Sequence, residues 1–208
     1  GAEVGPSLNQ TKNYFLGLYL APSVVKNALK IVICGPSKVG KTVIANALSE
    51  FSHVVTSDYH PTKGVRILEM NKELAGELLK KYQSVAKSSS NALNIELWDM
   101  SGSRSLQSCW PAIKYGAHGI IIVIDAVSVR YESVLDEWLS TFCSDCDKKR
   151  ISCFSYRKDD AKKEVKGKKT CNQYPSLPIY EVKNDMSVLL PAFNAVINQI
   201  VQCKDVEV

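Results

Sequence analysis

The sequence predicts an α/β fold: a six-stranded, mostly parallel sheet with one antiparallel hairpin at its edge and helices on both faces. Three features of the 208 residues support this fold. A β-branched run at 31–34 leads into a glycine-containing turn and then a helix at 43–48. Residues 119–125 form a continuous apolar run, which is typical of a strand buried in a parallel sheet. Two segments, 65–69 and 93–98, alternate apolar and polar residues, as the half-buried strands of a hairpin do.

The remaining elements alternate along the chain, which favours one globular α/β domain. With 45% hydrophobic residues, the chain is long enough to bury a core of its own. A helical segment interrupts the hairpin, because Leu74, Leu78 and Tyr82 recur at helical spacing between its strands. This segment either packs on its own domain or meets a partner. Further helices are predicted at 128–142 and 188–201, and further strands at 151–156 and 179–182.

The turn after the predicted strand at 31–34 has the pattern G-x-x-x-x-G-K-[ST], from Gly35 to Thr42. In this pattern backbone N–H groups surround a phosphate chain, and the N-terminus of the following helix adds a favourable dipole. Lys41 supplies a positive charge for the β- and γ-phosphates, and the Thr42 hydroxyl can ligate Mg²⁺. The loop therefore predicts a nucleoside triphosphate ligand. We expect this ligand to contact the run Ser37, Lys38, Val39, Gly40, Lys41, Thr42 and Val43.

Two short motifs further along the chain would complete a magnesium site. Asp99 and Gly102 form D-x-x-G directly after a predicted strand, and Thr62 lies in the loop before the hairpin. Mg²⁺ prefers six oxygen ligands. The Thr42 and Thr62 hydroxyls, two phosphate oxygens and two waters, one of them held by Asp99, would supply six. Thr62 and Gly102 could also donate their N–H groups to the γ-phosphate. Tyr59 could either close over the phosphates or lie on the surface.

These motifs, in this order and spacing, resemble the Ras-like small GTPase family. Within it the chain is similar to the Rab-like proteins of intraflagellar transport, on residues 61–69, 96–99, 108–112 and 117–119. The resemblance spans about residues 28–203 and implies a P-loop small-GTPase G domain that binds GTP or GDP with Mg²⁺. It also implies a subunit of intraflagellar transport complex B that docks on coiled-coil subunits of that complex, in the cilium or flagellum and in the cytoplasm.

The resemblance also suggests how the chain is divided. Residues 1–27 form an N-terminal extension, which either packs across the domain or serves as a docking peptide. Residues 28–203 form the G domain, and 204–208 form a tail. Inside the G domain, 71–92 is expected to be a helical insertion in the edge hairpin. Residues 157–176 are expected to be a basic segment that replaces a helix. We expect a monomer outside the complex.

Two departures from Ras-like enzymes predict slow GTP hydrolysis. Such enzymes place a glutamine directly after D-x-x-G to orient the attacking water, whereas this chain has Ser103. The third residue of its phosphate loop is Ser37, where glycine is frequent in the family. We therefore assign no catalytic residue from the sequence, and nothing in the sequence brings the neighbouring Arg104 to the phosphate.

The guanine-reading motif N-K-x-D is degenerate, because residues 157–160 read Arg-Lys-Asp-Asp at its expected place. Lys158 could flank the base. Asp160 could accept hydrogen bonds from guanine N1 and N2, which would reject adenine. Alternatively, Asp160 is an ordinary solvated acid in a charged loop. Because the asparagine is missing, we do not expect the loop to be as rigid as in the family.

Charge is concentrated in one part of the chain. The net charge is +5, and residues 148–169 carry ten Lys/Arg against three acids, a local excess of +7. Such a stretch suits an acidic partner, nucleic acid or anionic lipid. Its cationic residues beyond the predicted strand are not interleaved with aromatic ones, so we favour a solvated loop and expect no nucleic acid.

Two further patterns concern lipid anchoring and the state of the cysteines. The end of the chain, 203–208, does not read C-a-a-X, so we expect no lipid anchor. The seven cysteines are odd in number and favour reduced thiols over a disulfide framework. Four of them could bind zinc, although their spacings match no common zinc module. These four are Cys143, Cys146, Cys153 and Cys171.

The leading hypothesis is a binding module whose loops at Thr62 and Gly102 are ordered by GTP and Mg²⁺ and read by a partner. The alternatives are a GTPase switch that hydrolyses with an activator, and a phosphotransferase on the same loop. Partner contact is expected at the helical segment of the hairpin and at four apolar residues: Trp110, Ile113, Val65 and Ile67. Trp110 could equally lie in the core.

Overall fold

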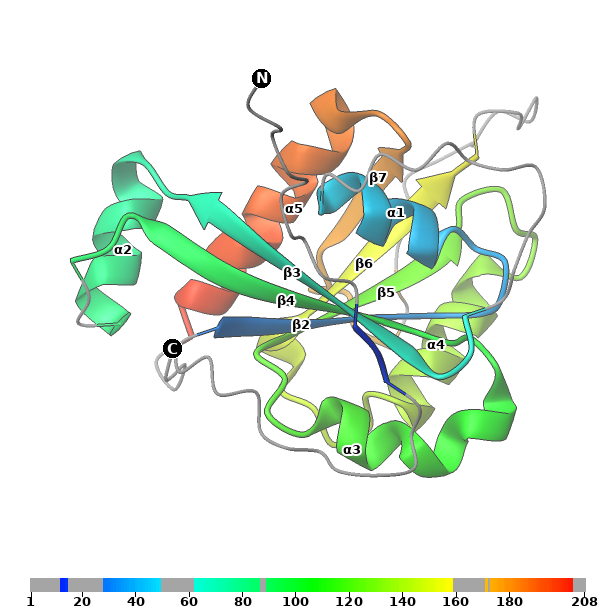
Figure 1. Ribbon diagram of the computed structural model, residues 1–208. Helices are drawn as coiled ribbons and strands as arrows, with labels where there is room; N and C mark the ends of the chain where they lie inside the picture. The colour runs from blue at the N-terminus through cyan, green and yellow to red at the C-terminus, as the bar shows by residue number, and fades with distance from the viewer. Residues whose placement is uncertain are drawn as a thin grey trace, which may run out of the picture.

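The fold is described from a computed structural model, in residues 12–14, 28–49, 62–86, 89–158, 171 and 173–203. One sheet has the strand order β1-β3-β4-β2-β5-β6-β7 (Figure 1). The β1–β3 and β3–β4 pairs are antiparallel, and all other neighbouring pairs are parallel. The strands are β1 (Lys12–Tyr14), β2 (Ala28–Cys34), β3 (Val65–Glu73), β4 (Ala92–Met100), β5 (Gly119–Asp125), β6 (Ile151–Arg157) and β7 (Ile179–Lys183).

The mostly parallel sheet with an antiparallel edge hairpin is confirmed, and its six predicted strands are β2 to β7. The structure adds a seventh strand. β1, from the N-terminal extension, pairs with the outer edge of β3 through Lys12↔Ile67, Asn13↔Arg66 and Tyr14↔Val65. A strand of three residues carries too little periodicity to be read from sequence.

Helices cover both faces of the sheet (Figure 1). α1 and α5 lie on one face, over a core that includes Phe154 and Phe193. α3 and α4 lie on the other, over a core that includes Trp138 and Phe142. No helix within the described ranges is long and apolar enough to cross a membrane. The helices are α1 (Lys41–Leu48), α2 (Gly76–Ala86), α3 (Trp110–Lys114), α4 (Tyr131–Thr141) and α5 (Met186–Val201), with 3-10 helices η1 (Arg104–Cys109) and η2 (Lys148–Arg150).

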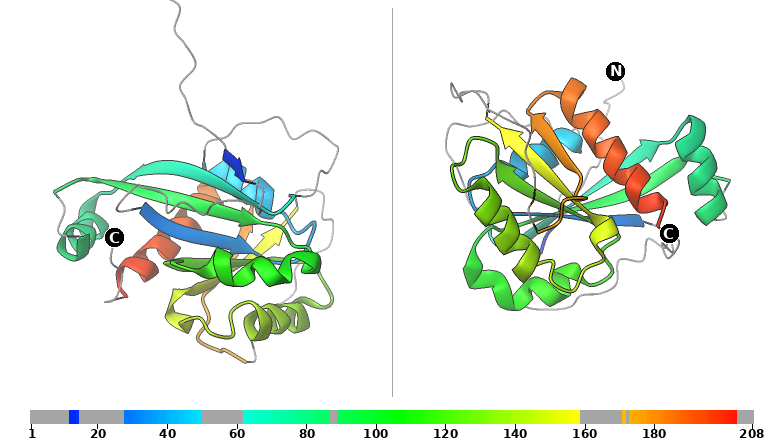
Figure 2. Two further views of the ribbon diagram at one scale, coloured as in Figure 1. Left: turned by 60° about the horizontal axis from the view of Figure 1, so that its bottom comes forward. Right: turned by 180° about the vertical axis from the view of Figure 1, so that it is seen from behind.

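The insertion in the edge hairpin is shorter than the predicted 71–92. Residues 71–73 continue β3, because they pair with residues 92–94 of β4. Only α2 is helical, and its Tyr82 is buried in the same core as Val201 of α5. The two helices lie side by side when the molecule is seen from behind (Figure 2). Of the two roles considered for this helix, packing on its own domain is therefore observed.

Three of the four residues suggested for partner contact are buried. Trp110 belongs to an aromatic cluster, with its ring centroid 5.4 Å from that of Trp138 and 5.2 Å from that of Phe142. Ile113 and Val65 are buried in the same core. Partner contact is therefore wrong for Ile113 and Val65, whereas for Trp110 the alternative place in the core is observed. α3 turns Trp110 and Ile113 toward the core that α4 shares, and Val65 of β3 lies in the same core. Ile67 is half-buried against the same core.

A buried lysine lies on this face of the sheet. Lys30 of β2 donates a hydrogen bond from Nζ to the Tyr115 carbonyl oxygen (2.8 Å), and Nζ lies 3.5 Å from the centre of the Trp98 ring. The Trp98 indole donates to Glu96 Oε2 (3.0 Å). Burial lowers the pKa of Lys30 to about 8, although the nearby Glu96 opposes the shift.

This shift predicts that wild-type protein gains stability relative to Lys30→Met as the pH rises. The folded-state pKa is depressed below 10.5, so the unfolded chain binds the proton more tightly, and the free energy of unfolding rises between about pH 8 and 10.5. We expect a relative gain on the order of 1–2 kcal/mol, allowing for partial solvent access. Urea denaturation of both proteins across this pH range measures it, and parallel pH profiles would contradict the prediction.

Candidate functional site

The phosphate loop, residues 35–42, connects β2 to α1 at the carboxyl ends of the parallel strands. Its backbone has positive φ at Gly35 (133°), Lys38 (65°) and Gly40 (103°). Left-handed residues of this kind curl a backbone so that successive N–H groups face a common centre. Val39 is buried, while Ser37 and Lys38 are exposed. The loop thus has its apolar member anchored in the core and its polar members facing outward.

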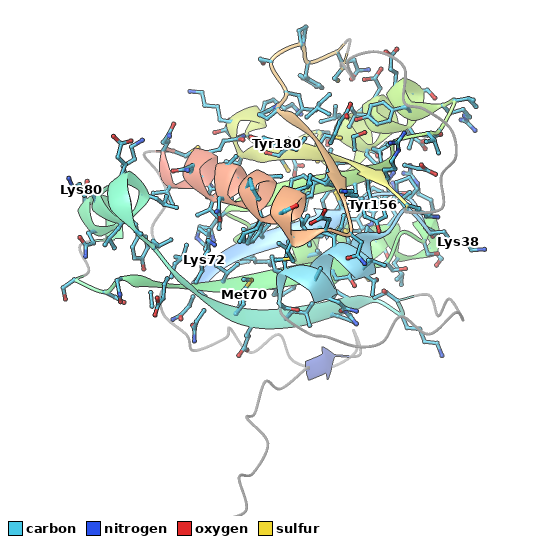
Figure 3. The ribbon with its side chains drawn as sticks, turned by 90° about the horizontal axis from the view of Figure 1, so that it is seen from above. Lys38, Met70, Lys72, Lys80, Tyr156 and Tyr180 are labelled. Atoms are coloured by element: carbon cyan, nitrogen blue, oxygen red, sulfur yellow. The ribbon has the colours of Figure 1, made fainter. Side chains whose placement is uncertain are left out.

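Tyr156, near the end of β6, supports this loop. The ring is buried and packs so closely on Gly40 that a Cβ added there would lie 2.5 Å from the ring's Cε1. Figure 3 shows Tyr156 on the same side of the molecule as Lys38, opposite to Lys80 of α2. Sequence reasoning missed this residue, although it directly precedes residues 157–160. The aromatic contact supports the loop beside the place where the motif's asparagine is missing.

Lys41, the first residue of α1, keeps its side chain within the loop. The side chain is buried, and Nζ donates hydrogen bonds to the carbonyl oxygens of Gly35 (3.0 Å) and Pro36 (2.6 Å). Burial lowers the pKa of Lys41, and the carboxylate of Asp99 opposes this shift. A desolvated cation at the centre of the loop can stabilise an anionic ligand strongly, because little water screens it.

The three predicted magnesium ligands lie together beside the loop. The Thr42 hydroxyl donates to Asp99 Oδ2 (2.8 Å) and lies 3.1 Å from the Thr62 hydroxyl oxygen. The Asp99 side chain is fully buried, and its Oδ1 has no hydrogen-bond partner among the residues that the structure describes. Burial raises the pKa of Asp99. The charge of Arg66, the Thr42 hydrogen bond and the charge of Lys41 oppose this shift without cancelling it. Hard oxygen donors around a buried, partnerless carboxylate oxygen fit Mg²⁺.

Arg66 of β3 is the second site residue that sequence reasoning missed. Its Nε lies 3.3 Å from Asp99 Oδ2, and its Nη2 donates to Asn46 Oδ1 on α1 (2.6 Å). Arg66 stands directly opposite Asp99 in the antiparallel β3–β4 register. The alternation of β3 predicts a polar residue at this position, but its charged partner depends on the strand pairing.

Gly102 and Ser103, which follow Asp99, have different roles. Gly102 lies against the phosphate loop so closely that a Cβ would overlap the Ser37 nitrogen and the Pro36 carbonyl carbon. The Ser103 hydroxyl accepts a hydrogen bond from the Ser105 N–H (3.3 Å) and caps η1.

Arg104 reaches away from the loop. Its Nη2 donates to Glu137 Oε1 of α4 (2.5 Å), and its guanidinium lies 5.1 Å from the Trp138 ring centre. The hydrogen-bond partners of the Ser103 and Arg104 side chains described above thus lie outside the phosphate loop.

The remaining predicted residues are only partly placed. Val43 lies in the first turn of α1 and is half-buried against the core under α5. Lys158 is exposed just beyond the end of β6. Tyr59 and Asp160 lie outside the described residues, as do most of the 1–27 extension, most of the basic segment and the tail 204–208.

The zinc alternative gains no support. Among the residues that the structure describes, no three His, Cys, Asp or Glu side chains gather to hold a metal ion. The cysteines considered for zinc are all within the described ranges and are free thiols. Cys143, Cys153 and Cys171 are buried in the core beneath α4.

Comparison with known proteins identifies the family. The model of the Roc domain (Ras of Complex, Roc, domain of DAPkinase) matches residues 30–159. The chain belongs to the Roc/Ras-like GTPase family. On this chain the match begins in β2 and ends beyond β6, so it includes the phosphate loop, Thr62, Asp99 and Gly102.

Curated relatives show which members of the family the chain is similar to. Intraflagellar transport protein 22 homologs match at 36% identity over 116 residues in Danio rerio and over 113 residues in Homo sapiens. These matches cover 56% and 54% of this chain and 57% and 55% of the relatives, so the chain spans about half the length of the curated relatives it matches. The resemblance of this chain to the Rab-like proteins of intraflagellar transport is confirmed.

A solved structure has the same fold. The T. brucei IFT22/74/81 GTP-bound crystal structure contains a chain with 27% sequence identity and a TM-score of 0.61. The match covers 84% of this chain and 95% of that chain. The similarity therefore extends across nearly the whole G-domain fold, beyond the half of the chain matched in sequence.

Proposed function

We propose that this chain is a GTP-binding, Rab-like subunit of intraflagellar transport complex B that docks on coiled-coil subunits in a nucleotide-dependent way and hydrolyses GTP slowly or negligibly. The observation that carries the proposal is the cluster of Thr42, Thr62 and Asp99 beside the buried Lys41. The relatives named intraflagellar transport protein 22 support the transport role and a location in the cilium or flagellum, and we propose the cytoplasm as a second location.

Each part of the site has a role in this proposal. Lys41 and the backbone of residues 37–43 hold the phosphates, and Thr42, Thr62 and Asp99 hold Mg²⁺, Asp99 through a water. Mg²⁺, when bound, neutralises part of the phosphate charge. Base recognition is assigned to Lys158 and Asp160, and Tyr59 is assigned to the cover over the phosphates.

Nucleotide-dependent docking follows from where Thr62 and Gly102 lie. Thr62 is three residues before β3, and Gly102 is two residues after β4, so both border the same hairpin. A ligand that contacts both loops orders them together, and a partner that touches them binds the ordered state more tightly. The IFT22/74/81 structure supports a partnership with other transport subunits, and we propose coiled-coil subunits of complex B as the partners.

Slow hydrolysis follows from the side chains after Gly102. The Ser103 hydroxyl is engaged with Ser105, and Arg104 is held by Glu137. Neither supplies the water-orienting group or the positive charge that accelerates GTP hydrolysis in this class. Among the described residues, these two side chains therefore support a site that holds a triphosphate and cleaves it slowly.

The test combines nucleotide content, hydrolysis and docking. We expect GTP in the supernatant of denatured purified protein, and single-turnover hydrolysis at or below about 10⁻⁴ s⁻¹, the intrinsic scale of the class, with or without a coiled-coil partner. Partner capture should be stronger for the GTP-loaded than for the GDP-loaded form. ATP in the supernatant would refute the role of Asp160. Fast, partner-stimulated phosphate release would instead favour an active GTPase switch.

A further inference from the structure

We propose that Arg66 is a positioning residue that sets the Mg²⁺ concentration at which this protein retains its nucleotide. The inference rests on the proposed function and goes beyond it, because Arg66 is not among the residues assigned to hold the metal or the phosphates. It makes the arginine a built-in counter-ion that competes with the metal for one buried carboxylate.

The two carboxylate oxygens of Asp99 differ in their contacts. Oδ2 accepts a hydrogen bond from the Thr42 hydroxyl at 2.8 Å and pairs with Arg66 Nε at 3.3 Å. Oδ1 is buried and has no hydrogen-bond partner in the described part of the chain. The Asp99 side chain is 0% exposed and that of Arg66 23%. The guanidinium therefore compensates a fully desolvated negative charge, which would be costly if it were unpaired.

The position of Arg66 is fixed from two sides. The antiparallel register sets its backbone directly opposite Asp99. At the far end of the side chain, Nη2 donates to Asn46 Oδ1 of α1 at 2.6 Å. Because a guanidinium stays protonated at any physiological pH, this cation is a permanent feature of the site.

A fixed cation at this place opposes a divalent one. Arg66 withdraws negative charge from the carboxylate that would hold the Mg²⁺ water, and it repels the metal through a region that little solvent screens. The same ion pair stabilises the metal-free protein. Both effects raise the free Mg²⁺ concentration needed to retain nucleotide, so Arg66 makes retention sensitive to the metal.

The test compares charge-neutral and charge-conserving variants. Release of a fluorescent GDP analogue is followed in chelator-buffered Mg²⁺, and the free Mg²⁺ that gives half-maximal slowing of release is determined. We expect Arg66→Gln to lower this midpoint roughly three- to tenfold. Arg66→Lys retains the charge and should stay near wild type. Arg104→Gln, which removes an arginine paired with Glu137 away from the site, is the matched control.

The outcomes separate the possible roles. If Arg66 were merely structural, Arg66→Gln would lower thermal stability while leaving the Mg²⁺ midpoint unchanged, and that result would overturn the inference. An increased midpoint would overturn it as well. If wild-type protein retained no guanine nucleotide even at saturating Mg²⁺, the proposed function would fail together with this inference. Retention with equal midpoints in all variants would remove the inference alone.

Discussion

Gly40→Ala should destabilise the folded protein by about 3 kcal/mol and weaken nucleotide retention. The φ of 103° at Gly40 is one that L residues adopt only with strain. In addition, the new methyl group would lie 2.5 and 2.6 Å from two carbons of the Tyr156 ring. That ring is buried and packed in the core, so the loop has to shift instead of the ring.

Urea denaturation measures this loss, and Gly116→Ala is its matched control. Gly116 also has a positive φ, 68°, but a Cβ there meets nothing within 4 Å. The control therefore reports backbone strain alone, expected at about 1 kcal/mol, and the difference between the variants reports the Tyr156 contact. Equal losses in the two variants would show that Tyr156 does not constrain the loop.

Lys41→Ala should weaken guanine nucleotide binding about 100-fold or more. The ammonium is desolvated inside the loop, and its hydrogen bonds go to the loop carbonyls of Gly35 and Pro36. Charge-assisted hydrogen bonds from such a group to phosphate oxygens contribute about 1.5–3 kcal/mol each. The variant removes this charge without disturbing the packing of Val39 or Tyr156.

Equilibrium titration with a fluorescent GTP analogue at saturating Mg²⁺ measures the effect. Lys72→Met serves as the control, because Lys72 is a half-buried lysine that lies on β3, where it pairs with Leu93 far from the loop. The two lysines share a pKa lowered by burial, so the comparison isolates position. Affinity retained in Lys41→Ala would refute the phosphate role of the loop.

The sequence by itself determined the sheet, its hairpin and the ligand class. Continuous apolar runs identify β2 and β5, and alternation identifies β3 and β4, because burial on two faces or one imposes these periods. The phosphate loop is equally local, since eight consecutive residues carry its glycines, lysine and threonine. Thr62, Asp99 and Gly102 could be added because their motifs keep a fixed order along the chain.

Only the tertiary structure decided which side chains meet across the fold. Arg66 reaches Asp99 through the β3–β4 register, and Tyr156 reaches Gly40 because the end of β6 lies beside the phosphate loop. The packing of α3 against α4 buries Trp110. Local periodicity reports which face of an element is buried, but not which distant segment covers it. These contacts depend on strand register and helix packing, which are properties of the whole chain.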